Sequence, residues 1–330
     1  MNILLVRVSS LGDVLHNLPM VADILRHHPD ANIDWVVEEG YTSLVRLNPH
    51  VRRVIPFALR RWRKGLFNPA VRAEVRNFFR TLREEPYDFV FDTQGLIKTG
   101  IVMAAARVRK GGLKVGMANG TEDSGYEGVS RIFHTRSVPV ALRTHAVARG
   151  RQVVASVLGY DLSTPPDFGL STPAPSVRPT WMPAGDYAVF FHATAGATKR
   201  WDAPNWIRLG QGLAALPAPL PILLPWGSAR EKLDAEQLAA ALPNAVVLPK
   251  LSMMDAVELA RRARLAVGVD TGLTHIAAAF GRPTIEIYVD SPRWKTEGNW
   301  SPRIVNLGDT GHPPSSGDVI RAAQRLLEQS

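Results

Sequence analysis

The chain has 330 residues, 45% of them hydrophobic and 21% charged, which are ordinary values for a globular protein and exclude a disordered or fibrous chain. It contains no cysteine, which excludes disulfides, thiolate metal sites and thiol nucleophiles. Residues 1–165 carry 23 Lys and Arg against 15 Asp and Glu, whereas residues 166–330 carry 16 against 15, so the basic excess lies in the first half and implies an anionic partner there.

The predicted elements alternate between strand and helix in chain order. Apolar runs at residues 3–8, 32–37 and 89–91 predict buried parallel strands, with helices at residues 14–26 and 71–83. After a stretch rich in proline the alternation resumes, with strands at residues 187–191, 221–224, 246–248 and 265–269 and helices at residues 206–216, 231–242 and 256–263.

This pattern predicts an α/β fold of two doubly wound domains, which agrees with about 100–200 residues per domain. We expect the first domain at residues 1–165, a proline-rich linker at 166–186 and the second domain at 187–330, with the last helix as a candidate to pack back on the first domain. No apolar run is long enough to span a bilayer, and the N-terminal run is too short for a secretory signal. We therefore expect a cytoplasmic protein.

Ligands of open α/β sheets bind beyond the carboxyl ends of the strands, and the loop after the first predicted strand is one such place. It reads Ser-Ser-Leu-Gly-Asp at residues 9–13 and leads directly into a helix. Asp13 is either a residue that caps this helix or a catalytic carboxylate. Gly12 allows close approach of the backbone to a ligand.

The second loop, at residues 192–201, reads His-Ala-Thr-Ala-Gly-Ala-Thr-Lys-Arg-Trp and follows the first strand of the second domain. Its small residues, its hydroxyls and Lys199 are suited to a phosphate cradle of backbone N–H groups and one ammonium. The spacing of a Walker A loop is absent, which disfavours a P-loop NTPase. The alternative is a flexible polar loop.

The third loop carries Asp270, Thr271, Gly272 and His275 between a predicted strand and a small apolar helix. Such a helix start directs backbone donors and a positive dipole end toward a phosphate. Asp270 as a helix cap and His275 as a surface residue are the alternatives. Because the second and third loops belong to the same domain, we favour a site for a nucleotide diphosphate.

Three further features bear on function. Glu231, near a helix start, either binds ribose hydroxyls or complements the helix dipole. The Gly-x-Gly-x-x-Ala match at residues 210–215 lies inside a predicted helix, which disfavours a dehydrogenase. No Asp-x-Asp and no histidine cluster with the spacing of metal ligands is present, so a metal-dependent transferase is disfavoured. Residues 46–83 hold 11 basic residues against one acid, Glu74.

Taken together, these loops resemble those of the lipopolysaccharide heptosyltransferases. The matching stretches run through both domains, at residues 8–16, 34–40, 60–64, 94–98, 224–227 and 270–275. Residues 34–39 (Asp-Trp-Val-Val-Glu-Glu) and 60–64 (Arg-Arg-Trp-Arg-Lys) are most similar to members that add the first heptose of the inner core. The chain departs from the family at residues 195–197 (Ala-Gly-Ala) and 289–294 (Val-Asp-Ser-Pro-Arg-Trp), where polar residues and a Gly-Pro-Thr turn are common.

The resemblance implies the glycosyltransferase-B architecture, in which two Rossmann-like domains face each other across a cleft. It implies an inverting, metal-independent transfer of L-glycero-D-manno-heptose from ADP-heptose to the Kdo region of Kdo-lipid A, with no cofactor. By the same resemblance Asp13 is the general base. The donor-binding residues are Thr194, Lys199, Glu231, Asp270, Thr271, Gly272 and His275. The acceptor-binding residues are Ser10, Gly12, Arg60, Arg61, Arg63, Lys64 and Lys98.

Two other functions stay open from the sequence. A paralogous heptosyltransferase that adds a later core heptose would have the same fold and loops. A non-enzymatic polyanion-binding protein would use the basic face of residues 46–83, although no nucleic-acid motif is present and no nucleic-acid partner is expected. A lipid acceptor and a basic first domain also predict peripheral attachment to the anionic cytoplasmic face of the inner membrane.

Overall fold

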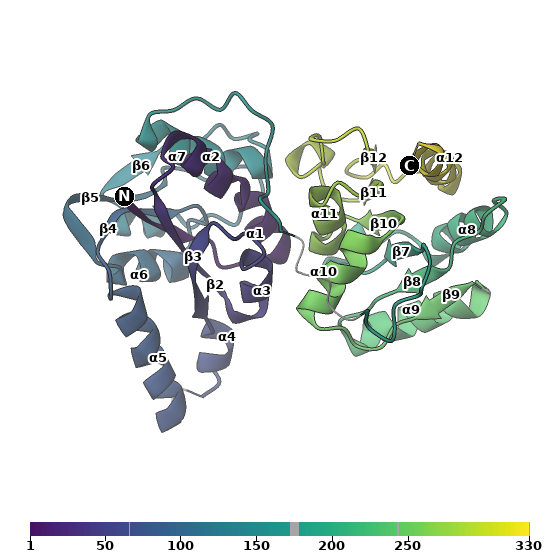
Figure 1. The fold of residues 1–330 in the computed structure, drawn as a ribbon, viewed down its shortest axis with the longest axis horizontal. Helices are drawn as coiled ribbons and strands as arrows, with labels where there is room; N and C mark the ends of the chain where they lie inside the picture. Colours follow the sequence, from purple (N-terminus) through teal and green to yellow (C-terminus); the bar gives the residue numbers. More distant parts are fainter. Residues whose placement is uncertain (66, 172–177, 243, 330) are drawn as a thin grey trace. The chain divides into compact units, whose positions relative to one another are not determined.

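The computed structural model describes residues 1–65, 67–171, 178–242 and 244–329. The chain divides into two compact units, Met1–Thr172 and Pro173–Ser330 (Figure 1). This division lies inside the linker predicted at residues 166–186, of which residues 172–177 lie outside the described part. Among the described residues, no helix has both the length and the apolar character needed to cross a membrane.

The first unit is built on a sheet of six parallel strands in the order β3-β2-β1-β4-β5-β6. Its strands are β1 (Asn2–Val6), β2 (Asn32–Glu38), β3 (Val51–Phe57), β4 (Tyr87–Asp92), β5 (Val108–Met117) and β6 (Arg136–Val138). β1 lies in the middle of the sheet, paired with β2 and β4, and all five of its residues are buried. Its apolar sequence therefore reflects burial on both faces, as expected of a parallel strand.

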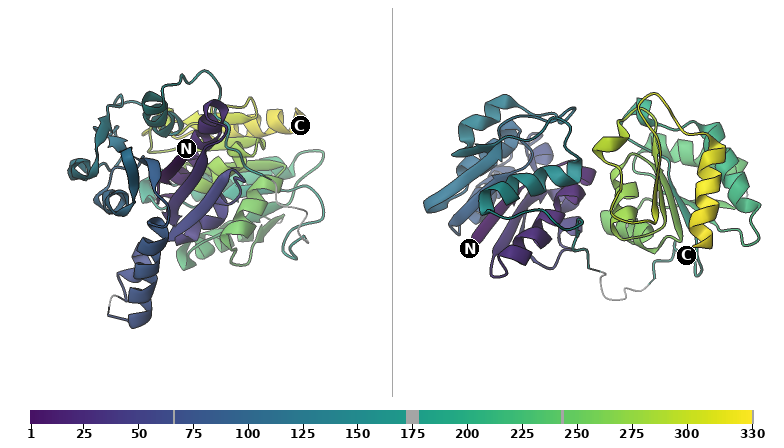
Figure 2. Two further views of the ribbon diagram at one scale, coloured as in Figure 1. Left: turned by 60° about the vertical axis from the view of Figure 1, so that its left-hand side comes forward. Right: turned by 90° about the horizontal axis from the view of Figure 1, so that it is seen from above.

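Helices cover both faces of the first sheet. They are α1 (Leu11–Asn17), α2 (Pro19–His27), α3 (Thr42–Val45), α4 (Leu59–Trp62), α5 (Pro69–Leu82), α6 (Ile97–Ala105) and α7 (Ala146–Leu158), with 3-10 turns η1 (Glu39–Tyr41) and η2 (Gly128–Phe133). α1 and α2 pack against α7, while α5 and α6 share a core with β1 and β4 on the other face. α4 and α5 form an arm that extends away from the sheet (Figure 2).

The sequence predicted one helix over residues 14–26, and the structure has two. α1 ends at Asn17 and α2 begins at Pro19. Proline has no N–H and clashes with the preceding turn, so it interrupts a helix but fits the first position of a new one. The apolar periodicity continued across this break, which concealed it.

The second unit repeats the architecture with strand order β12-β11-β10-β7-β8-β9. Its strands are β7 (Ala188–Phe191), β8 (Ile222–Leu224), β9 (Ala245–Val247), β10 (Leu265–Val269), β11 (Thr284–Tyr288) and β12 (Ile304–Gly308). Every pairing is parallel, and counted within the unit this is the same 3-2-1-4-5-6 order as in the first sheet, read from the other edge. Both sheets therefore have the Rossmann-like order.

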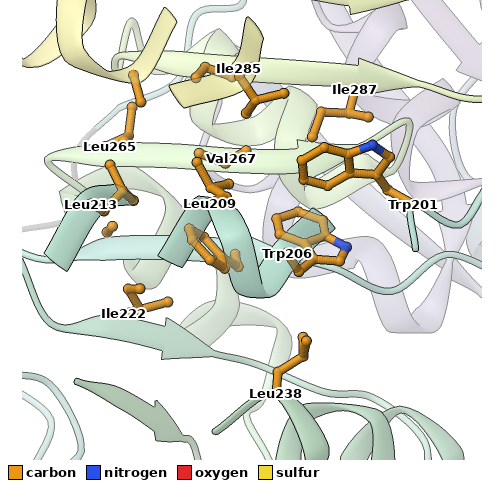
Figure 3. Packing of buried hydrophobic residues seen from close by; sticks show 14 of the residues in the cluster. Trp201, Trp206, Leu209, Leu213, Ile222, Leu238, Leu265, Val267, Ile285 and Ile287 are labelled. Atoms are coloured by element: carbon orange, nitrogen blue, oxygen red, sulfur yellow. The ribbon is translucent and has the colours of Figure 1, made fainter. Parts of the chain in front are cut away.

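The helices of this unit are α8 (Ala203–Ala214), α9 (Ala229–Ala241), α10 (Met253–Arg262), α11 (Gly272–Ala279) and α12 (Ser316–Glu328), with 3-10 turns η3 (Ala197–Lys199) and η4 (Arg293–Lys295). α8, α9 and α12 enclose one core with the sheet, in which Trp201 and Trp206 meet edge to face (Figure 3). The final helix α12, which the sequence left as a candidate to return to the first domain, buries Val319, Ala322 and Leu326 in this core.

The three loops singled out in the sequence follow the carboxyl ends of β1, β7 and β10. β1 neighbours β4, and β7 neighbours β10, at the points where the strand order of each sheet reverses. Crevices open at these switch points of doubly wound sheets and are their usual ligand sites. The topology thus gives each unit one expected site, at Asp13 in the first and at Lys199 and Asp270 in the second.

Candidate active site

The carboxylate of Asp13 lies in the first turn of α1 and is bound on both of its oxygens. Oδ2 accepts hydrogen bonds from the backbone N–H and the hydroxyl of Ser10, each at 3.0 Å. Oδ1 faces the guanidinium groups of Arg7 at 2.6 Å and Arg149 at 3.6 Å. The helix-capping interpretation of Asp13 is confirmed, because Oδ2 forms a capping box with Ser10. Oδ1 remains among cations, and its catalytic role stays a prediction.

Two buried arginines set the charge state of Asp13. Arg7 follows β1, Arg149 lies on α7, and the side chains of both are about 95% buried, whereas that of Asp13 is 34% exposed. Burial by itself raises the pKa of Asp13, but Arg7, the Ser10 N–H and Arg149 outweigh it and hold this pKa well below its usual range. Asp13 is therefore ionised at neutral pH and reachable from solvent.

The loop before α1 is held by polar side chains from the loop that follows the neighbouring strand β4 and from helix α6. Gln94 accepts from the backbone N–H of Val8 at 2.9 Å and donates to the Ser9 hydroxyl at 3.2 Å. Lys98 donates to the same hydroxyl at 3.1 Å. Lys98, predicted to bind the acceptor, is therefore brought next to the loop that carries Ser10, Gly12 and Asp13.

The basic cluster of residues 60–64 is partly neutralised by acids that the sequence analysis did not pair with it. Arg61 bonds Glu39 at 3.0 Å and Glu74 at 2.7 Å, and Arg60 lies 3.7 Å from Glu38. Within the described part of the chain Arg63 and Lys64 are exposed and make no ion pair.

Lys98 links this basic cluster to the loop at residues 9–13, because it feels the charge of Arg60 and Arg63 and donates to Ser9. An open depression of about 370 Å³ is lined by Arg60, Arg61 and Lys64 together with residues 38–41. The pKa of Lys98 is lowered, first by burial and then by the positive charge of Arg60, Arg63 and Arg7, against the opposing effect of Glu38. Trp62, which stands among the basic residues 60–64 in the sequence, is buried and packs on Phe57 and Phe78. Its indole is therefore part of the core and not of the basic surface.

In the second unit the structure joins the second and third loops through one carboxylate. Lys199 donates to Asp270 Oδ2 at 2.7 Å, and His275 Nε2 and the Thr296 hydroxyl reach Oδ1 at 3.1 Å each. Burial raises the pKa of Asp270, but His275 and Lys199 outweigh it and hold this pKa far below its usual range. Asp270 is thus an ionised carboxylate that contacts Lys199, His275 and Thr296. The two simple alternatives are wrong, because the N-cap residue of α11 is Thr271 and not Asp270, and because His275 is only 2% exposed.

The start of α11 presents backbone N–H donors beside the Asp270 carboxylate. Thr271 is its N-cap residue and Gly272 its first residue. Lys199 in η3 approaches from the loop after β7, where Thr194 lies 8% exposed. An ammonium and the unpaired N–H groups of a helix start form a site suited to an anionic group. Among the described residues, no three His, Asp or Glu side chains are arranged to hold a metal ion.

Glu231 is engaged at the start of α9. Its Oε2 accepts from the backbone N–H groups of Gly227 at 2.7 Å and Ser228 at 3.2 Å, while Ser228 accepts from the Glu231 N–H. This reciprocal pattern is a capping box, which agrees with the helix-start interpretation of this glutamate. A role toward ribose hydroxyls would use the other oxygen, Oε1.

Several residues at these sites were missed in the sequence. Arg7 and Arg149 contact Asp13, and Glu286 bonds His275 at 2.8 Å. Arg7 follows an apolar strand directly, and Glu286 stands inside the apolar run of β11. A charged residue in or beside a buried strand is a signal that could have found both, since burial of a charge requires a partner. Arg149, in a helix that the sequence analysis did not predict, carries no such signal.

The family model for glycosyltransferase family 9 (heptosyltransferase) matches residues 75–319. The chain is 41% identical over 289 residues to lipopolysaccharide heptosyltransferase 1 of Pseudomonas aeruginosa, covering 87% of this chain and 78% of that protein. It is 39% identical over 290 residues to lipopolysaccharide heptosyltransferase 1 of Escherichia coli K12, covering 87% of this chain and 88% of the relative.

Solved structures agree with these relatives. The E. coli heptosyltransferase WaaC with ADP has a TM-score of 0.83 at 33% identity, covering 99% of this chain and all of that one. The same enzyme with ADP-2-deoxy-2-fluoro heptose has a TM-score of 0.78 at 34% identity, covering 100% and 99% of the two chains. The α/β fold with two Rossmann-like sheets predicted from the sequence is confirmed.

Proposed function

This chain belongs to glycosyltransferase family 9, the heptosyltransferases, and from that premise we propose that it transfers L-glycero-D-manno-heptose from ADP-heptose to the Kdo region of Kdo-lipid A. The transfer inverts the anomeric carbon, needs no metal and adds the first heptose of the lipopolysaccharide inner core. Two features at the switch points carry this proposal. The first unit has an ionised, accessible carboxylate, Asp13, and the second unit has a site suited to an anion at Lys199 and the start of α11.

The proposed reaction is a single displacement with Asp13 as the general base. The acceptor hydroxyl attacks the anomeric carbon while its proton passes to Asp13, and the bond from that carbon to the diphosphate oxygen breaks on the opposite face. ADP leaves with the electron pair, so the configuration inverts. A positioned base contributes about 10²–10⁴-fold to such a step. Because Asp13 stays ionised, it is available as a base over the whole neutral range.

Negative charge develops on the departing diphosphate, and in this proposal protein donors receive it in place of a metal. Lys199 and the backbone N–H groups at the start of α11 contact the diphosphate, and Thr194 adds a hydroxyl. Donors that are fixed before the reaction stabilise such charge without reorganising, which is a large source of catalysis. Asp270 and His275 shape the heptose side of this pocket, and Glu231 holds the ribose through Oε1.

The acceptor carries carboxylates and phosphates, and the basic residues of the first unit are matched to it. Arg63 and Lys64, which have no ion pair in the described part of the chain, are the most available cations. Lys98 binds acceptor groups closest to the attacking hydroxyl because it already donates to Ser9, with Ser10 and Gly12 beside it. Arg60 and Arg61 would exchange part of their bonding to Glu38 and Glu39 for acceptor oxygens.

We also propose cytoplasmic localisation with peripheral attachment to the inner face of the inner membrane. Phe67, 99% exposed, is next to the arm of α4 and α5, and Arg72, Arg76 and Arg80 recur every four residues along the exposed side of α5. Basic residues near an anionic leaflet contribute about 1 kcal/mol each, and aromatic rings favour the interface. Within the described part of this unit the exposed large apolar residues are Phe67, Ile97, Ile101, Val129, Ile132 and Leu142.

Mass spectrometry of the purified protein, incubated with ADP-heptose and Kdo-lipid A in excess chelator, tests the reaction. We expect one added heptose per acceptor and one ADP released. Transfer that occurs only on an already heptosylated acceptor would identify a paralogue that adds a later heptose. No transfer to either acceptor, with or without chelator, would refute the proposed activity and favour a polyanion-binding role. Transfer that occurs without chelator but not with it would refute metal independence.

A further inference from the structure

Glu286 is a fully buried carboxylate in the middle of β11, a strand whose other residues are also buried. Its Oε1 lies 2.8 Å from His275 Nδ1, and its Oε2 accepts from the Tyr288 hydroxyl at 2.9 Å and from the Gly298 N–H at 2.8 Å. Among the described residues, His275 is the one cationic group paired with it. A buried charge with this complete set of partners needs a reason beyond packing, because its removal from water is costly.

The geometry fixes the charge of His275. One ring nitrogen faces Glu286 at 2.8 Å and the other faces Asp270 at 3.1 Å, so each nitrogen points at a carboxylate oxygen. A neutral imidazole has one N–H and would turn a lone pair toward one of these carboxylates, whereas an imidazolium donates to both. Burial lowers the pKa of His275, but the two carboxylates outweigh it and raise this pKa to about 10.

We infer that Glu286 is a positioning residue of the donor site, which holds His275 as an imidazolium so that its Nε2–H fixes the Asp270 carboxylate beside Lys199. This rests on the proposed function, since Lys199 and the start of α11 are the proposed diphosphate site. Four side chains of alternating charge are thus joined in order: Glu286, His275, Asp270 and Lys199. Their negative and positive charges cancel before the nucleotide sugar binds.

Glu286 also holds residues 296–298 against these four side chains. Its bond to Gly298 and the bond of Thr296 to Asp270 anchor residues 296–298, which follow the stretch at residues 289–294 that departs from the family. Charge and anchoring thus come from one side chain. A glutamine at position 286 has one carbonyl oxygen, so it can still accept from His275 Nδ1–H or from the Gly298 N–H but not from both, and it removes the negative charge. The pH dependence of Glu286→Gln separates the two contributions, because a lost anchor weakens binding equally at every pH, whereas a lost charge does not.

The pH dependence has a defined sign. His275 is faced by Glu286 from β11 and by Asp270 from the loop after β10, while the Tyr288 hydroxyl lies beyond Glu286 and Lys199 lies beyond Asp270. In the natural protein the ring stays charged from pH 6 to pH 9. In Glu286→Gln one carboxylate that raises the pKa is gone while burial still lowers it, so the ring loses its proton within that range. Its lone pair then faces Asp270 and displaces the carboxylate.

Calorimetric ADP binding from pH 6 to pH 9 tests this consequence, and Glu258→Gln is the matched control. Glu258 is another buried glutamate of the same unit, paired with Arg261 and Arg262 in α10. Relative to Glu258→Gln at each pH, we expect Glu286→Gln to bind ADP roughly tenfold more weakly at pH 9 and nearly equally at pH 6. Glu286→Asp, which keeps the charge, should restore much of the affinity at pH 9. A deficit that is the same at every pH would overturn the inference.

The protonation of the ring can be observed directly by NMR of protein with ¹⁵N-labelled histidine, with His275 assigned by comparison with His275→Gln. Both ring nitrogens should carry hydrogen up to about pH 9 in the natural protein, and only one should do so at pH 8 in Glu286→Gln. A neutral ring at pH 7.5 in the natural protein would overturn the inference even if Glu286→Gln did not fold. Absence of ADP binding by the natural protein would instead refute the proposed function and leave the ring measurement valid.

Discussion

At the scale of single residues, Asp13 shows how one carboxylate can cap a helix and still be placed for the role of general base that we propose. Oδ2 completes the capping of α1 through Ser10, while Oδ1 faces Arg7 and Arg149 and is partly open to solvent. The two arginines keep the Asp13 carboxylate ionised, so it can accept a proton, but by lowering its pKa they also make it a weaker base. A contact with the acceptor that draws either arginine away would strengthen the base at the moment it is needed.

We expect Asp13→Asn to keep ADP binding and to lose about 10²–10⁴-fold in kcat, because an amide cannot take the proton. Asp255→Asn is the matched control, since Asp255 occupies the same position in the capping box of α10 with Ser252. Kinetics and ADP calorimetry on both variants measure the effect. Equal, small losses in the two variants would show that Asp13 serves only as a cap.

The depressed pKa of Asp13 gives a prediction for pH. Its folded-state pKa lies below its unfolded value, so ionised Asp13 stabilises the protein above about pH 4, and this contribution is lost as the pH falls further. Arg149→Gln removes one of the cations that lower it. The acid limb of the plot of kcat against pH should then move to higher pH by roughly one unit. An unchanged acid limb would mean that Arg7 and Ser10 alone set the charge of Asp13.

At the scale of elements, the proposed donor site depends on how closely α11 lies against β10. A methyl group on Gly268 of β10 would fall 2.1 Å from the Thr274 hydroxyl of α11 and 2.8 Å from Phe191 Cβ of β7. The Thr274 hydroxyl donates to the Val269 carbonyl, which closes the turn that carries Asp270. Glycine at this position therefore sets the distance between the helix start and the strand end.

Gly268→Ala should lower the free energy of unfolding by about 1–3 kcal/mol, because this close-packed position has no room for a methyl group. It should also weaken ADP binding, since α11 and its backbone donors would move. Gly185→Ala is the control, because a methyl group there meets nothing within 4 Å. Denaturant unfolding and ADP calorimetry on both variants decide the matter. A stable Gly268→Ala protein with normal ADP affinity would contradict this account of the site.

At the scale of the whole molecule, charge and exposed apolar surface are both uneven along the chain. The first unit holds the basic excess and most of the exposed large apolar residues, whereas in the described part of the second unit these are Leu233 and Val246. A surface that is both basic and apolar is suited to an anionic bilayer interface. The acceptor residues and the membrane contact that we propose therefore belong to the same unit.

Phe67→Ser should therefore reduce cosedimentation with vesicles that contain anionic phospholipid by several-fold, because the exposed ring is expected to enter the interface. Binding of the natural protein should also weaken with added salt as the charges are screened. Leu233→Ser, at an exposed apolar residue of the second unit, should leave binding unchanged. Equal binding by all three proteins would refute Phe67 as a membrane contact.

Much of this architecture could be predicted from the sequence, because it depends on local patterns. The apolar runs located β1, β2, β7 and β10, and small and polar residues after three of them located the candidate loops. The break at Pro19 was missed because the apolar period continues through it. The strand at Thr284–Tyr288 was also missed, although a glutamate inside an apolar run, here Glu286, indicates a buried charge.

By itself the sequence determined two α/β units, a basic first half and the loops that carry Asp13, Lys199 and Asp270, since these follow from composition and from periodicity along the chain. Only the tertiary structure decided which charges meet. Arg149 reaches Asp13 from 136 positions away, and Lys199 reaches Asp270 across 71. Such pairs arise where strand order, and not sequence order, sets neighbours. Because burial strengthens each pair, the same packing also sets which groups are ionised.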